Sequence, residues 1–417
     1  MNRALKQPVV LASTLIGAVL ALVVGLAYLG GFSNPVGNLH DVQVGIVDLD
    51  EPQQLGDREL SVGATFHRAL LDRIAAADDS PVRLVTYPDE AAAREALLDN
   101  RVTGVAILPA DLTATVIDIG MRSATGQPAE PATVRLLLNE GAGALQPSVV
   151  TQAATAAQQQ LADTVSGLLV AQLDAAGLQV HPSNAAVIGQ PVRVETVGLP
   201  HLGDHAGRGL PPLYYSVVIT LVGLFGAVAL HALVGALVDE EPQHILGRKL
   251  DLGHLDLDRW QRYRLEAVLL VPTAVLGGIV ATVTATGIVG TQIASVPATL
   301  LVSILGALAL SQLTLAVITG FGSLGLLVAV LATTIFGVPS ARGVYPAEAI
   351  PAFFQALGFL PMRWIVDGAR AAFYFDGRAD AGLRGSIVVL VAYVVGSVLA
   401  GVAVARLSHR RSIEPST

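Results

Sequence analysis

Residues 267–341 form a run of 75 positions without a single aspartate, glutamate, lysine or arginine. A helix rises about 1.5 Å per residue, so a bilayer core about 30 Å thick takes roughly 20 helical residues. The run is therefore long enough for three membrane crossings. Three further charge-free runs allow one crossing each: 7–40, 209–238 and 385–405. The sequence predicts a polytopic α-helical membrane protein with about six transmembrane helices, one before and five after a soluble region.

This pattern divides the chain into three parts. Residues 1–36 are predicted to be an N-terminal transmembrane anchor, because the apolar stretch exceeds the ~7–15 residues of a secretory signal and no convincing cleavage site follows it. Residues 37–210 are predicted to form an inserted extracytoplasmic α/β domain. Residues 211–417 are predicted to form a membrane domain of five helices, with a charged cytoplasmic loop at 238–264.

The α/β prediction rests on alternating patterns in the polar part, which carries 21 acidic and 10 basic residues. Period-two patterns alternate with helical spacing, as in a small α/β domain. The predicted strands are 41–50, 82–87, 102–109 and 132–140, and the predicted helices are 63–77, 89–100 and 148–176.

Basic residues near the apolar runs predict the orientation, because cytoplasmic loops carry more lysine and arginine. With both termini in the cytosol, the basic residues of both termini and of the 238–264 loop lie inside, and the short loop 291–296 has none. Segment 339–385 then lies outside despite five arginines, so it is predicted to form interfacial or re-entrant helices. Arg363, Asp367 and Arg370 have helical spacing there, which favours an exposed charged ladder with a structural role at the outer surface. The excess of arginine over lysine, with much alanine, glycine and valine, indicates GC-rich coding bias, and the predicted location is a bacterial plasma membrane.

Several kinds of chemistry are excluded or disfavoured by the motifs. The chain has no cysteine and no G-x-x-x-x-G-K-[ST] motif, so it has neither thiol chemistry nor a P-loop ATP site. "GFGSLG" (320–325) matches a dinucleotide fingerprint, but it lies in an apolar stretch without a preceding strand, which favours a tight turn. His201, Asp204 and His205 could share a metal on a helix, although the following glycines favour a hydrated linker. No enzyme, cofactor, metal site or nucleic-acid partner is predicted; an enzyme acting on lipid would lack any supporting residue constellation.

Three features remain as candidate functional groups. His231 and Gln312 are polar residues within predicted spans, so they mark a polar path or, for His231, an interface position. No carboxylate is expected inside the spans, which argues against a proton-driven transporter. Gly17, Ala21 and Gly25 form a small-residue stripe suited to helix packing. The 238–264 loop, with a possible short helix, is either an ordinary solvated loop or a docking element for a soluble partner. Its charged candidates are Asp239, Glu240, Glu241, Arg248 and Lys249.

The order of parts resembles the phage-infection-protein (YhgE/Pip) branch of the ABC-2 type permeases. The domain opens on "VGIVDLDEP", "AAAREALLDNRVTGVAILPADLTATV" (91–116) leads from a helix to a strand and a proline, and "LPMRWIVDGAR" (360–370) precedes the last helix. The family usually has V-N-x-D where this chain has Val47, Asp48, Leu49 and Asp50, so that match is partial.

The resemblance implies an export permease that works as a homodimer with a separate ATP-binding subunit. That subunit would hold the ATP and dock on the 238–264 loop, and the cargo would be a lipid, glycan, drug or peptide. The alternative is a non-transporting scaffold or receptor, such as a secretion-system accessory, that acts through its extracytoplasmic domain.

Overall fold

A computed structural model of the chain describes residues 19, 21–30, 40–55, 58–76, 80, 82–143, 146–175, 177–238, 243–245, 248–250 and 255–413. The chain forms two compact units. One comprises residues 39–204, and the other comprises residues 1–38 together with 205–417.

Unit 39–204 is built on a five-stranded sheet with the strand order β4-β1-β5-β6-β7. Its strands are β1 (Val42–Asp48), β4 (Val82–Tyr87), β5 (Gly104–Leu108), β6 (Ala132–Asn139) and β7 (Val192–Leu199). β1 pairs in parallel with β4 and β5, whereas β6 runs antiparallel to β5 and parallel to β7. A separate hairpin joins β2 (Gln53–Leu55) to β3 (Arg58–Leu60).

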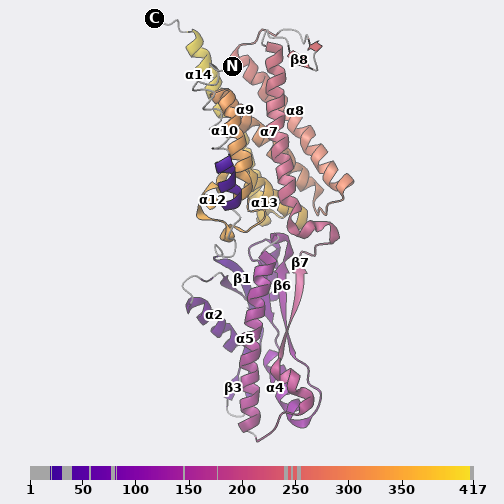
Figure 1. Cartoon of the computed structure of the whole chain (residues 1–417). Coiled ribbons are helices and arrows are strands. Elements are labelled where there is room, and N and C mark those ends of the chain that lie inside the picture. The colour runs from indigo at the N-terminus through magenta and orange to yellow at the C-terminus, as the bar shows by residue number, and fades with distance from the viewer. Residues whose placement is uncertain are drawn as a thin grey trace, which may run out of the picture. The chain divides into compact units, whose positions relative to one another are not determined.

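Helices cover both faces of this sheet. Ile46 and Leu108 pack in one core with α2 (Val62–Ala76), α4 (Leu112–Thr125), α5 (Gln146–Ala175) and α6 (Ala185–Gly189). Figure 1 shows the long helix α5 running along the sheet. Val47, which follows Ile46 on β1, and Ile107, which precedes Leu108 on β5, point to the other face of the sheet. Helix α3 (Glu90–Leu98) covers that face. This alternation is why the buried strands are apolar on both faces. The prediction of an α/β domain is confirmed, with β7 and α4 as elements that the sequence patterns had not indicated.

The carboxylate of Asp50, just beyond β1, holds the first turns of two helices. It accepts hydrogen bonds from the Gly63 amide of α2 (2.7 Å) and from both the amide (2.8 Å) and the hydroxyl (2.6 Å) of Thr113 in α4. The Thr113 hydroxyl oxygen in turn accepts the Val62 amide at 2.8 Å. One side chain thus satisfies backbone donors that a helix leaves free at its N-terminus, in two helices at once.

Glu90, at the start of α3, predicts an acid-dependent loss of stability. Hydrogen bonds from Arg135 on β6 (2.6 and 3.2 Å) lower the pKa of Glu90 more than partial burial raises it, and Arg94 lowers it further. The stabilising effect is therefore complete above the unfolded pKa of about 4.3 and disappears as the pH falls through the lower folded pKa. We expect Glu90→Gln to reduce the domain's stability by about 1 kcal/mol at neutral pH and to have little effect near pH 2.

Hydrogen exchange of the full chain at both pH values measures this difference in peptides from α3 and β6. Glu195→Gln, which changes an exposed glutamate on β7, is the matched control. Equal effects of Glu90→Gln at both pH values would contradict the pairing.

The second unit contains four described helices that are long and apolar enough to cross a membrane. They are α7 (Pro211–Val238), α8 with its π-helical end (Arg259–Val289), α9 (Val296–Phe321) and the helix Ala379–Leu407 within η8 (Ala379–Leu383) and α14 (Arg384–Ile413). α9 packs against the other three (Figure 1). The chain therefore has the helices of a membrane-embedded protein.

The other two predicted spans are represented by shorter described helices. Residues Ala21–Gly30 are helical, and so is the stretch Leu324–Ser340, which comprises most of α10 (Ser323–Val330), the π-helix η5 (Leu331–Ile335) and α11 (Gly337–Ser340). Gly322, with a φ of 59°, separates α9 from α10, so "GFGSLG" forms the predicted tight turn. Segment 339–385 contains helices, as predicted, and its main elements are α12 (Ala352–Ala356), η7 (Leu357–Phe359) and α13 (Pro361–Tyr374).

Candidate functional site at the ends of α7 and α8

Three ionisable side chains meet where α7 approaches its end and α8 begins. Glu266 of α8 is only 2% exposed, and its carboxylate lies 2.9 Å from Nε of Arg262 and 2.9 Å from Nδ1 of His231 on α7. Arg262 also donates from Nη2 to the His231 carbonyl oxygen at 3.2 Å. The cluster therefore joins the two helices through both side chains and backbone.

This cluster corrects one expectation from the sequence. A carboxylate was not expected inside the spans, because the charge-free run begins only at Ala267. The structure starts α8 at Arg259, so Glu266 lies within the candidate span Arg259–Val289 and is buried there. The argument against a proton-driven transporter, which relied on the absence of a carboxylate in the spans, therefore no longer holds. Arg262 nevertheless compensates the charge of Glu266 directly, which favours a structural role for this carboxylate.

Gln312 lies on α9 beside the same part of α8. Its side-chain nitrogen donates to the Ala267 carbonyl oxygen at 2.8 Å, and the residue is 2% exposed. Among the described residues its Oε1 atom has no hydrogen-bond partner. The two predicted polar residues, His231 and Gln312, thus contact adjacent residues of α8, with Glu266 as the member of the group that the sequence had not indicated.

The first turns of α8 are fixed at several further points. Asp258 and Gln261 form a capping box, in which each side chain accepts a hydrogen bond from the backbone amide of the other. Tyr263 is 3% exposed and donates to the Val398 carbonyl oxygen of α14 at 3.1 Å. A side chain at Gly401 would collide with the Tyr263 ring, so glycine permits this close approach. Arg406 of α14 lies over the Trp260 ring, 4.7 Å from its centroid.

The connection between α7 and α8 contains the predicted docking residues. Asp239, Glu240 and Glu241 lie outside the described residues. Arg248 and Lys249 belong to β9 (Arg248–Leu250), which pairs antiparallel with β8 (Gln243–Ile245). The short helix expected at this place is therefore wrong: the described residues form two strands, and the next helix begins at Arg259. Leu255 bonds back to the Leu237 carbonyl oxygen at 2.8 Å, which closes the connection near the ends of both helices.

The other predicted residues do not join this cluster. Gly17 lies outside the described residues, and Ala21 is exposed. A Cβ on Gly25 would meet nothing within 4 Å, so the stripe makes no close helix contact with the described part of this chain. The helix packs instead through Val23, Val24, Ala27 and Tyr28, near Ile335 and Phe354.

The possible metal ligands are His201, Asp204 and His205. His201 is exposed, and the side chains of Asp204 and His205 lie outside the described part of the structure. No group of three potential metal ligands occurs within the described residues.

The charged residues of α13 form only part of the predicted ladder. Nε of Arg363 lies 3.6 Å from Asp367, as expected for positions four apart. The sequence predicted that Arg370 would be exposed, but this expectation is wrong, because the residue is only 6% exposed. Its side chain donates to the carbonyl oxygens of Arg342 (2.9 Å) and Gly343 (3.4 Å). The reason is that α13 packs against α7, α9 and α14, which turns this face inward.

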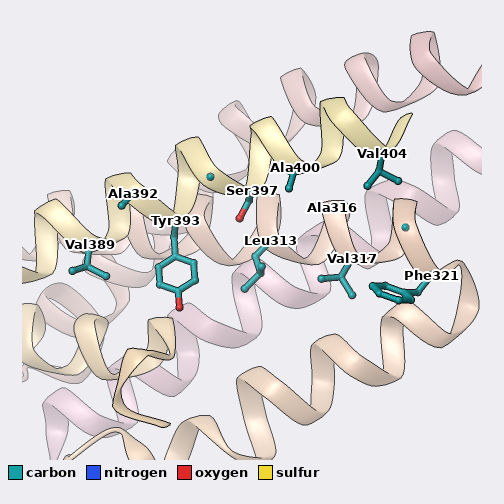
Figure 2. A pocket seen from close by; sticks show the side chains of 12 residues that line it. Leu313, Ala316, Val317, Phe321, Val389, Ala392, Tyr393, Ser397, Ala400 and Val404 are labelled. Carbon is teal, nitrogen blue, oxygen red and sulfur yellow. The ribbon is translucent and has the colours of Figure 1, made fainter. Parts of the chain in front are cut away.

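Two apolar grooves open along the helices. One, about 550 Å³, lies between α9 and α14, with Leu313, Val317, Tyr393 and Val404 among its walls (Figure 2). The other, about 480 Å³, lies between α7 and α8 and includes Tyr214, Val218 and Val280. Both have almost entirely apolar walls, so they suit hydrocarbon better than a polar solute.

No protein-family model, curated protein or solved structure matches this chain.

Proposed function

We propose that this chain is the permease subunit of an ABC-2 type exporter, working as a homodimer with a separate ATP-binding subunit. In this proposal six helices cross a bacterial plasma membrane, both termini are cytoplasmic and unit 39–204 is extracytoplasmic. The four long apolar helices and the α/β unit placed before them support it. The observation that carries most weight is the cluster of His231, Arg262 and Glu266. This cluster links α7 to α8 next to the connection between them, on which the ATP-binding subunit would dock.

The bracing explains how force could pass from that connection into the membrane domain. A force on residues 239–258 acts on α7 and α8 together, because the His231–Glu266 side-chain contact and the Arg262–His231 backbone bond join the two helices. Tyr263 and Trp260 transmit the same displacement to α14. ATP binding on the partner would then favour one of two access states, since a ligand shifts an equilibrium through its different affinity for each state.

Alanine at Glu240, Glu241, Arg248 and Lys249 together tests the docking step. We expect the variant to remain in the membrane, to lose co-purification with its ATPase and to lose at least about tenfold of its export or drug-tolerance activity, because rim charges guide and orient such contacts. The control replaces Asp380 and Arg384, an exposed ion pair elsewhere, by alanine.

The outcome also separates the proposed function from its alternative. Export that survives the fourfold replacement, in a chain that still reaches the membrane, would contradict ATPase docking at this connection. A phenotype that instead follows deletion of residues 40–204 alone would favour the non-transporting scaffold or receptor.

A further inference from the structure

Two arginine side chains converge at Gly358, beside the start of α13. Nη1 of Arg363 and Nη2 of Arg342 lie 2.9 Å and 3.8 Å from the point that a Cβ on Gly358 would occupy. Arg363 donates one hydrogen bond, from Nη1 to the Gly358 carbonyl oxygen at 3.1 Å, and its Nε lies 3.6 Å from the Asp367 carboxylate, beyond hydrogen-bond distance. The Arg342 guanidinium makes no hydrogen bond to any residue that the structure describes. The two guanidinium groups therefore lie near Gly358 with donors that make no hydrogen bond to the described residues.

The surrounding structure holds the two arginines close together despite their like charge. Arg370 binds the carbonyl oxygen of Arg342, whose backbone has a φ of 57°, and the Arg363 guanidinium lies 4.6 Å from the Trp364 ring centroid. Burial, followed by the charge of Arg363, lowers the pKa of Arg342, and Asp367 and Glu348 offset this only in part. Three arginines thus face two carboxylates, which leaves an excess positive charge for an anion.

The apolar groove between α9 and α14 begins next to these arginines. Phe359 follows Gly358 directly, is 59% exposed, and accepts a hydrogen bond from the Tyr393 hydroxyl at 2.8 Å. Val389 lies at one end of the groove with Tyr393 one turn further along α14, and Val404 lies at the other end (Figure 2). At about 1.5 Å per residue, Tyr393 and Val404 are roughly 16 Å apart along α14, which is about the thickness of one leaflet of a ~30 Å hydrocarbon core. An extended acyl chain fits such a groove.

We infer that this surface binds an anionic phospholipid, with its phosphate between Arg342 and Arg363 and an acyl chain in the groove beyond Tyr393. Guanidinium groups suit phosphate because they offer parallel donors to its oxygens. The site stands on these residues alone, so it holds whether the lipid is cargo or a resident part of the protein.

The test is lipid binding by the purified full-length chain in detergent, followed by native mass spectrometry. The probes are phosphatidylglycerol, diacylglycerol with the same chains, and glycerol phosphate. We expect phosphatidylglycerol to bind at least about tenfold more tightly than diacylglycerol, and glycerol phosphate not to compete at equal concentration. The variant Arg342→Gln/Arg363→Gln should lose at least about tenfold of the affinity for phosphatidylglycerol, and Arg342→Lys/Arg363→Lys should retain part of it.

Matched variants test each half of the site. Arg384→Gln removes an exposed arginine of the same region and should leave binding unchanged. Gly396→Leu, at a groove position where a Cβ meets nothing within 4 Å, should weaken binding, whereas Gly287→Leu, at an equally open position of the α8 end, should not. Equal affinity for phosphatidylglycerol and diacylglycerol would overturn the inference. Glycerol phosphate binding as tightly as the lipid would also overturn it, because the ligand would then be a soluble phosphate.

Discussion

Replacing Glu266 by glutamine is expected to lower the free energy of unfolding by ~2 kcal/mol, which for a unit of this size is a fall of about 5 °C in the melting temperature. The carboxylate is 2% exposed and compensates Arg262, so its loss leaves a charge in an apolar environment with only an amide beside it. Thermal unfolding of the purified full-length chain in detergent measures the effect. In the proposed exporter, the same variant should also reduce transport per molecule, since α7 and α8 would no longer move together.

The matched control is Asp380→Asn. Asp380 also pairs with an arginine four positions away, but its side chain is 60% exposed, so the expected cost is below about 0.5 kcal/mol. A second comparison identifies the cause: adding Arg262→Gln to Glu266→Gln should restore part of the lost stability if the uncompensated charge is responsible. A melting temperature unchanged by Glu266→Gln would refute the assigned role.

The second large effect is expected from Asp50→Ala in unit 39–204. Its carboxylate accepts three short hydrogen bonds at the first turns of α2 and α4, and each bond to a charged group contributes about 1.5 kcal/mol or more. We expect a loss of about 3 kcal/mol, which corresponds to a roughly hundredfold faster amide exchange at Gly63 and Thr113. Hydrogen exchange of the full chain, resolved by peptide, gives both values.

Asp111→Ala provides a matched control on the same helix. Asp111 occupies the N-cap position of α4, but its side chain makes no capping hydrogen bond, so its replacement should change exchange in α4 by less than about threefold. If Asp111→Ala has the larger effect, local capping rather than the long-range Asp50 contact secures α4.

Much of this architecture could be predicted from local patterns. Charge-free runs located α7, α8, α9 and α14, because helix length in a membrane depends on a continuous apolar sequence, but α8 begins and α14 ends eight residues beyond its run. Alternating and helical periods likewise indicated β1, β4, β5 and β6 and the helices between them. β7 was not predicted: Val192, Arg193, Val194 and Glu195 alternate, but Thr196, Val197 and Gly198 do not continue a clear apolar face.

Only part of the polar cluster at the ends of α7 and α8 could be predicted from the sequence. His231 and Gln312 were identified because polar residues are rare within apolar runs. Glu266 sits one residue before such a run, beside arginines at 262 and 264, and in the sequence it resembles the end of a solvated loop. Only the structure buries it.

The amino-acid sequence by itself determined where apolar helices and alternating strands form, because those depend on neighbours within a turn or two. The tertiary structure alone decided which polar groups meet: Glu266 with His231, 35 residues away, and Asp50 with Thr113, 63 residues away. Each contact requires a long loop of chain to close, and the energy that closes it comes from the packing of whole helices and sheets.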